Sequence, residues 1–184
     1  MKFLEIGQEI ETKIVAITDD CIFLDLNTKS EGILEKSELT DEDGIAKFNE
    51  FELPLNPMIG VIGVAPEGEP VPCGTPGRHG GNMDNTKIAE GATLYFPVFH
   101  KGALLAMGDV HAGMGDGEIM VTGVEIPAEI TVTVEVLKGK TIQNPRMENE
   151  EACYTIASDE NIEKAIYTAV SDMTAVVMEK LDMT

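Results

Sequence analysis

Alternation of hydrophobic and polar residues runs through the first part of the chain and predicts short β-strands. Successive side chains of a strand point to opposite faces, so an alternating run is typical of a half-buried strand. The residues on one face of the first run are Ile10, Thr12, Ile14 and Ala16. Two further runs follow, at residues 21–26 and from Gly32 onward. The polar stretches 19–20 and 27–30 separate the runs and predict turns.

The pattern continues between residues 45 and 140, where glycine and proline interrupt it. KFNEFELPLNP predicts one alternating strand whose prolines keep its end out of a central position. MIGVIGVAP is a continuous apolar run that predicts a buried strand, and EGEPVPCGTPGRHGGNMDN predicts a long loop. LYFPVFHKGALLAMGDVH predicts two strands around a turn at Lys101-Gly102. Two more strands are expected from EIMVTGVEIPAEITVTVEVLKG, the second over residues 130–137.

A different periodicity, with apolar residues three and four apart, predicts an amphipathic helix over residues 158–182. Ser158 or Asp159 is placed to cap its N-terminus. We expect its apolar face to pack into the core; the face consists of Ile162, Ala165, Ile166, Ala169, Val170, Met173, Val176 and Val177. Because the strand patterns outnumber this helical pattern, we predict a mainly β protein with one long C-terminal α-helix.

Composition narrows the expected partners and location. Hydrophobic residues make up 43% of the 184-residue chain, which is enough for a buried core. The formal net charge of -20 repels phosphate backbones, and the lysines and arginines are scattered, so nucleic acid is not an expected partner. Such acidity serves solubility or, as the alternative, attracts divalent cations. The sequence predicts neither a signal peptide nor a membrane span, and three widely spaced cysteines indicate a reducing, cytoplasmic setting.

Candidate chemistry gathers in the stretch MGDVHAGMGDGE. Asp109 and His111 stand two residues apart, so they would project from the same face of a strand. Asp116 and Glu118 would do the same if the strand resumes after Gly113. Carboxylates and an imidazole around flexible glycines suit a divalent metal site or an acid–base site. The alternative is that these Asp-Gly steps are only turns.

A second polar segment, RHGGNMD, offers two more candidates. His79 and Asp84 lie in a glycine-rich loop that could approach the first segment closely. Two of the three histidines of the chain therefore fall in these two segments, which favours a functional site over simple turns.

Three motifs in order, PLNPMIGVIGVAP, PGRHGGNMDN and GDVHAGMGDGE followed by VTGVEI, resemble the acetamidase/formamidase family. The resemblance runs from about Gly44 to the C-terminal helix. It implies a sandwich- or barrel-like β fold and the hydrolysis of short-chain amides, such as formamide and acetamide, to ammonia and a carboxylate. It also implies a divalent metal, zinc in the first place and calcium or another ion as alternatives. Family members commonly associate, which implies a homo-oligomer, most simply a dimer.

The resemblance implies roles for the polar residues of the three motifs. A subset of His79, Asp84, Asp109 and His111 would hold the metal, which polarises the amide carbonyl and activates water. Asp116 or Glu118 would take the proton from that water and deliver it to the departing ammonia.

The N-terminal residues have a different character. Residues 1–44 resemble the first three strands of an S1-type OB domain that binds RNA, although an ordinary β-meander is the other interpretation. We therefore predict two parts, an S1/OB-like fragment over residues 1–44 and an acetamidase/formamidase-like domain over residues 45–184. Family members are longer than this chain, so two alternatives to an active amidase stand: an RNA-binding module and a folded, inactive chimera.

Overall fold

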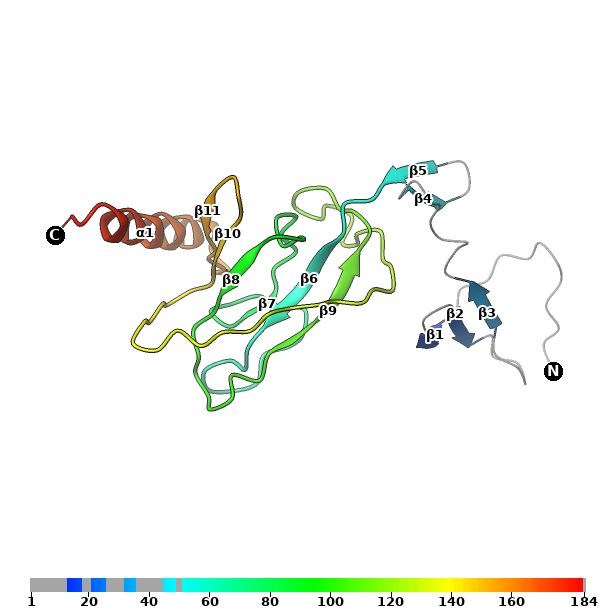
Figure 1. The fold of residues 1–184 in the computed structure, drawn as a ribbon, viewed down its shortest axis with the longest axis horizontal. Coiled ribbons are helices and arrows are strands. Elements are labelled where there is room, and N and C mark those ends of the chain that lie inside the picture. The colour runs from blue at the N-terminus through cyan, green and yellow to red at the C-terminus, as the bar shows by residue number, and fades with distance from the viewer. Residues whose placement is uncertain (1–12, 18–20, 26–31, 36–44, 49–50, 184) are drawn as a thin grey trace. The chain divides into compact units, whose positions relative to one another are not determined.

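A computed structural model describes residues 13–17, 21–25, 32–35, 45–48 and 51–183 of the chain (Figure 1). The chain divides into two compact units, Met1–Leu55 and Asn56–Thr184. This division places the segment just after residue 44 in the first unit. The assignment of the two parts to an S1/OB-like fragment and an amidase-like domain stays a prediction.

The first unit contains the predicted N-terminal strands. β1 (Lys13–Ile17), β2 (Cys21–Asp25) and β3 (Gly32–Glu35) form an antiparallel sheet in the order β1-β2-β3. The predicted positions Ile10 and Thr12, and the turns at 19–20 and 27–30, lie outside the described residues. A three-stranded meander fits both interpretations of this region, so the S1-type resemblance also stays a prediction.

A hairpin completes the first unit. β4 (Ile45–Phe48) and β5 (Phe51–Pro54) are antiparallel, and Phe48 pairs with Phe51. The prediction of one continuous alternating strand in KFNEFELPLNP was therefore wrong. A period of two is the same on both sides of a tight turn, so alternation alone cannot reveal the reversal.

The second unit holds two three-stranded antiparallel sheets. β6 (Met58–Gly63) lies between β7 (Gly80–Asn82) and β9 (Ala106–His111). β10 (Arg146–Glu148) lies between β8 (Thr93–Tyr95) and β11 (Cys153–Thr155). Side chains from both sheets join one core cluster, whose buried members are Ile62, Ile88 and Met147. The predicted β-rich architecture is confirmed, and so is the buried strand in MIGVIGVAP.

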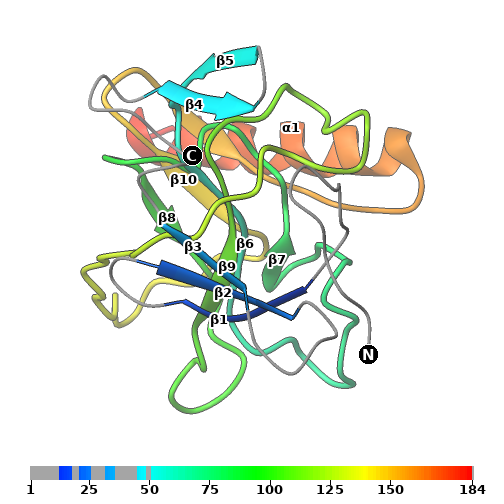
Figure 2. The same ribbon diagram turned by 90° about the vertical axis from the view of Figure 1, so that its right-hand side faces the viewer.

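The predicted C-terminal helix is present as α1 (Ile162–Lys180; Figure 1 and Figure 2), and it contacts β11. Its N-cap is Asn161 rather than Ser158 or Asp159: the Asn161 side-chain oxygen accepts hydrogen bonds from the backbone N–H groups of Glu163 and Lys164. No helix in the described part of the chain has the length and apolar character that a membrane crossing requires.

The expected burial of the apolar face of α1 was wrong for most of its length. Val176 is the buried residue of the helix, whereas Ile162, Ile166 and Val170 are 71%, 57% and 60% exposed. Helical periodicity shows which face is apolar, but it does not show how much of that face a neighbouring element covers.

The strand predicted at residues 130–137 was also wrong. This segment has no regular secondary structure, and its valines are exposed, Val134 and Val136 to 68% and 71%. Alternating valines favour a strand only where another strand supplies hydrogen bonds, and no described strand pairs with this segment.

Candidate active site

Pairing of β6 with β9 creates the floor of the candidate site. Ile59 pairs with Val110 and Val61 with Gly108, so Asp109 falls between these pairs, in the region of Gly60. Asp109 has a φ of 57°, in the left-handed region that residues other than glycine seldom adopt. A Cβ atom added at Gly60 would stand 2.5 Å from Oδ2 of Asp109. Only glycine at position 60 therefore leaves room for this carboxylate.

His111 ends β9 and is completely buried, with 0% of its surface exposed. Its Nε2 lies 3.1 Å from Oε1 of Glu125 and 3.4 Å from Oδ1 of Asp109. Neither contact has the geometry of a hydrogen bond, and both ring nitrogens lack a hydrogen-bond partner among the described residues. Gly123 packs against the other side of the ring, since a Cβ there would stand 2.5 Å from Nδ1. Buried polar atoms are rarely left unpaired, so this imidazole is a candidate functional group.

Asp84 reaches the same place from the loop after β7. The backbone N–H of Asp84 donates to the carbonyl oxygen of Gly60 at 3.2 Å, which fixes the residue on β6. Its Oδ1 is buried without a hydrogen-bond partner among the described residues and stands 2.7 Å from the Cβ position of Gly60. Burial, in the first place, and the neighbouring charge of Glu118 raise the pKa of Asp84 to about 6. A carboxyl group with this pKa can exchange a proton near neutral pH.

Glu118 comes from the loop between His111 and Glu125. The strand does not resume after Gly113, because Gly115 to Glu118 form a turn in which the Glu118 N–H donates to the Gly115 carbonyl oxygen at 3.2 Å. Glu118 has a φ of 41° and is half-buried. Glycines around it supply the freedom that such a turn needs.

Two groups of possible ligand atoms share His111. The atoms of Asp84, His111 and Glu118 lie within 4.8 Å of one another, and so do the atoms of Asp109, His111 and Glu125. The structure thus brings together four of the residues that the sequence singled out: Asp84, Asp109, His111 and Glu118.

The other two predicted residues lie apart from these groups. The carbonyl oxygen of His79 accepts a hydrogen bond from the N–H of Val64, which directly follows β6. His111 lies at the other end of β6, where it pairs with Met58. Burial lowers the pKa of His79. Asp116 is exposed, and its Oδ1 accepts a hydrogen bond of 2.7 Å from the Thr86 hydroxyl. Metal binding by His79 and proton transfer by Asp116 gain no support from this geometry.

Glu125 is the site residue that sequence reasoning missed. An antiparallel bridge pairs His111 with Glu125, and desolvation raises the pKa of the Glu125 carboxyl. A usable signal was present: the glycines between DVH and VEI allow the chain to return, and a returning strand would place Glu125 beside His111.

The donor set fits a divalent cation. One imidazole and four carboxylates converge, and the imidazole is buried with unpaired nitrogens. Several carboxylates this close repel one another unless a proton or a cation neutralises them. Calcium and magnesium prefer oxygen ligands alone, whereas imidazole together with carboxylate suits zinc and similar ions.

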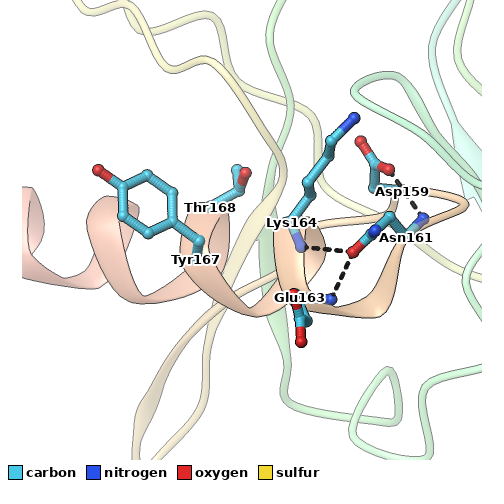
Figure 3. A pocket seen from close by; sticks show the side chains of 6 residues that line it. All are labelled: Asp159, Asn161, Glu163, Lys164, Tyr167 and Thr168. Atoms are coloured by element: carbon cyan, nitrogen blue, oxygen red, sulfur yellow. Dashed lines mark hydrogen bonds between the residues drawn. The ribbon is translucent and has the colours of Figure 1, made fainter.

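A depression at the N-terminus of α1 is a poorer candidate (Figure 3). Its volume is about 430 Å³, and its lining residues are Asp159, Asn161, Glu163, Lys164, Tyr167 and Thr168. Asn161 already accepts the hydrogen bonds of the first free N–H groups of the helix, as Figure 3 shows. The backbone N–H groups of Glu163 and Lys164 are therefore not free for a ligand, and the depression lies outside the carboxylate–histidine groups.

Comparison with known proteins agrees with the fold and the site region. The Acetamidase/Formamidase family profile matches residues 65–171, which include all five clustered residues, and the chain belongs to this family. A formamidase from Methylophilus methylotrophus is 41% identical over 64 residues, which are 34% of this chain and 16% of that protein. An acetamidase from Mycolicibacterium smegmatis is 40% identical over 65 residues, which are 35% of this chain and 16% of that protein.

Solved structures resemble a larger part of the chain. A recombinant predicted acetamidase/formamidase from Thermoanaerobacter tengcongensis is 51% identical with a TM-score of 0.71, over 82% of this chain and 48% of that one. An acetamidase from Bacillus halodurans is 42% identical with a TM-score of 0.71, over 82% of this chain and 50% of that one. The present chain thus spans about half the length of these solved relatives.

Proposed function

We propose that this chain carries the active site of an amidohydrolase that converts short-chain amides, such as formamide and acetamide, to a carboxylate and ammonia with the help of a divalent metal ion. The observation that carries the proposal is the buried His111, whose unpaired ring nitrogens stand among four carboxylates. Family membership supports amide hydrolysis, and the curated relatives are a formamidase and an acetamidase.

Asp109, His111 and Glu125 are the residues that would hold the ion. The two carboxylates are the ones that contact Nε2 of His111, at 3.4 and 3.1 Å. Zinc fits this combination of one nitrogen and two oxygen ligands. When bound, such an ion supplies Lewis acidity: it polarises a carbonyl group and makes water a better nucleophile at neutral pH.

Asp84 and Glu118 would move the protons. The Glu118 carboxylate takes a proton from water as the water oxygen forms a bond to the amide carbon. Asp84, protonated below a pKa of about 6, donates its proton to the amide nitrogen as the carbon–nitrogen bond breaks. The proton on Glu118 then passes to Asp84, whose carboxyl lies in the same group, and the products are a carboxylic acid and ammonia. Two neighbouring carboxyl groups, one acting as acid and the other as base, are typical of such a division of labour.

The substitution Glu118→Gln tests the proposal. The amide side chain keeps the shape of glutamate but cannot accept the proton, so ammonia release from formamide and acetamide should fall by about 10²- to 10⁴-fold while zinc content stays unchanged. Glu129→Gln, at an exposed position outside both groups, is the matched control and should keep full turnover. Full activity of the Glu118→Gln protein would remove Glu118 from the mechanism.

We also propose that the chain forms a homo-oligomer, most simply a dimer. Its support is the apolar surface left open on α1 and on the valines around Val134, because exposed apolar surface of this extent is typical of protein–protein contacts. The net charge of -20 opposes association, and salt weakens that opposition.

A further inference from the structure

The loop that carries Asp84 is fixed on both sides to β6. The Asp84 N–H donates to the Gly60 carbonyl oxygen at 3.2 Å, and the Ile59 N–H donates to the Ile88 carbonyl oxygen at 2.9 Å. Within the loop, Oδ1 of Asn85 accepts a hydrogen bond of 3.0 Å from the backbone N–H of Lys87. Thr86 therefore stands at a well-defined position beside the active site.

The loop that carries Glu118 has much weaker support. Its neck is closed by hydrogen bonds between Ala112 and Val124 and between Val124 and Gly113. Beyond the neck, the backbone N–H groups of Glu118 and Val121 donate to carbonyl oxygens of the same loop. The tip residues Ile119, Met120 and Val121 are 86%, 81% and 87% exposed, so packing does not hold the tip. A turn of this kind samples several conformations unless another segment restrains it.

One hydrogen bond links the two loops without requiring a carboxylic acid proton. The Thr86 hydroxyl donates to Oδ1 of Asp116 over 2.7 Å, two residues before Glu118. Any hydrogen bond between Asp84 and Glu118 would need one of the two to be protonated, but the hydroxyl donates at every pH. The Thr86–Asp116 bond thus persists while the two neighbouring carboxyls exchange protons.

We propose that Thr86 and Asp116 are positioning residues whose hydrogen bond holds the tip of the loop and keeps Glu118 beside Asp84. The inference rests on the proposed function, in which these two carboxyls transfer protons. It gives Asp116 a role different from that of a general base. Asp116 needs only an oxygen atom that accepts the Thr86 proton, whereas a base needs a carboxylate.

Paired substitutions separate the two roles. Thr86→Val removes the hydroxyl at constant size, and Asp116→Ala removes the acceptor. Each should lower kcat for formamide by about 3- to 10-fold, as expected for the loss of one ordinary hydrogen bond. Thr86→Ser and Asp116→Asn keep a donor and an acceptor, so kcat should stay within about twofold of the wild type. Zinc affinity should not change in any of the four, because the bond does not involve the metal ligands.

Two results would overturn the proposal. If Asp116→Asn loses as much kcat as Asp116→Ala, the carboxylate itself is required and Asp116 acts as a base. If Thr86→Val retains the wild-type kcat, the hydrogen bond positions nothing. Thr174→Val is the matched control, since the Thr174 hydroxyl also makes a hydrogen bond, to a backbone carbonyl within α1, and should leave kcat unchanged.

Amide hydrogen exchange measures how firmly the Glu118 loop is held, and it does not require catalytic turnover. In the metal-free protein, the amides of residues 115–121 should exchange about 3- to 10-fold faster in Thr86→Val and at the wild-type rate in Thr86→Ser. If the wild type hydrolyses no amide, the proposed function fails, and exchange alone then decides whether the bond restrains the loop. Equal exchange in wild type and Thr86→Val would refute the restraint.

Discussion

Nε2 of His111 lies 3.1 Å from Oε1 of Glu125, and a backbone bridge joins the same two residues. The chain leaves β9 at His111, passes through a glycine-rich loop and returns, and the Ile126 N–H then donates to the Val110 carbonyl oxygen at 3.0 Å. This return brings Glu125 to the same nitrogen of His111 that Asp109 contacts. Glu125 is therefore the residue whose removal best tests the observed geometry, because it was not among the candidate residues that the sequence singled out.

Glu125→Gln should weaken zinc binding by about 10- to 100-fold. Glutamine keeps the size of the side chain but loses the negative charge that a cation needs, and losses of this order follow the removal of groups that support a metal site. Isothermal titration with zinc measures the change. Glu129→Gln, on the same exposed segment, should bind zinc like the wild type. Equal affinities for the two variants would place the ion elsewhere.

Gly60→Ala should disrupt the same site. The new Cβ would stand 2.5 Å from Oδ2 of Asp109 and 2.7 Å from Oδ1 of Asp84, so both carboxylates must move. Their displacement should abolish most zinc binding, and overpacking at this buried position should cost about 1–3 kcal/mol of unfolding free energy. The control is Gly74→Ala, because a Cβ at that position meets no atom within 4 Å. Wild-type zinc affinity in Gly60→Ala would contradict the assigned crowding.

The carboxyl of Asp84 makes the stability of the metal-free protein depend on pH. Its pKa is raised from 3.8 to about 6 in the folded state, chiefly by burial, so the folded protein holds a proton that the unfolded chain has already released. This contribution is fully present below the unfolded pKa and is lost as the pH rises through about 6. Stability should therefore fall over this window and level off above it.

The variant Asp84→Asn isolates that contribution from the other acidic groups of the chain. Asparagine does not titrate here, so the variant does not lose this contribution as the pH rises. The melting temperature of the variant minus that of the wild type should therefore increase from about pH 5 to about pH 7. Thermal unfolding in the presence of a chelator provides the measurement. A difference that stays constant over this range would show that the Asp84 carboxyl has an ordinary pKa.

Local sequence patterns predicted where many of the strands and the helix lie. They predicted little about which other element covers a given face of a strand or helix. Alternation located β1, β2 and β3, and the apolar run located β6, because these features depend on neighbouring residues alone. The strand expected at residues 130–137 and the burial of Ile162 depend on a partner element, which the pattern does not specify.

The same distinction holds for the candidate site. Asp109 and His111 were predictable as neighbours because they stand two residues apart near the end of one strand. Glu125 depends on the return of the chain after a glycine-rich loop. Asp116 was a candidate because it is a polar residue of the GDVHAGMGDGE motif, and the motif does not show that a turn lies at residues 115–118. Backbone conformations with positive φ, at Asp84, Asp109 and Glu118, turn three of the carboxylates in ways that no periodicity indicates.

Association through α1 gives the last prediction. Ile166 and Val170 lie one helical turn apart and are 57% and 60% exposed, so a second copy could cover them and remove apolar surface from water. At micromolar concentration and moderate salt, light scattering should give a mass of at least two chains. The double substitution of Ile166→Glu with Val170→Glu should reduce it to one chain, because each buried charge would oppose the contact.

Ser171→Glu is the matched control for this experiment. Ser171 is an exposed polar residue of the same helix, so the variant adds a negative charge without removing apolar surface. It should stay associated, and lower salt should weaken association in the wild type and in this variant alike, since the chains repel each other with a net charge of -20. A one-chain mass for the wild type would refute association, and an associated double variant would place the contact away from Ile166 and Val170.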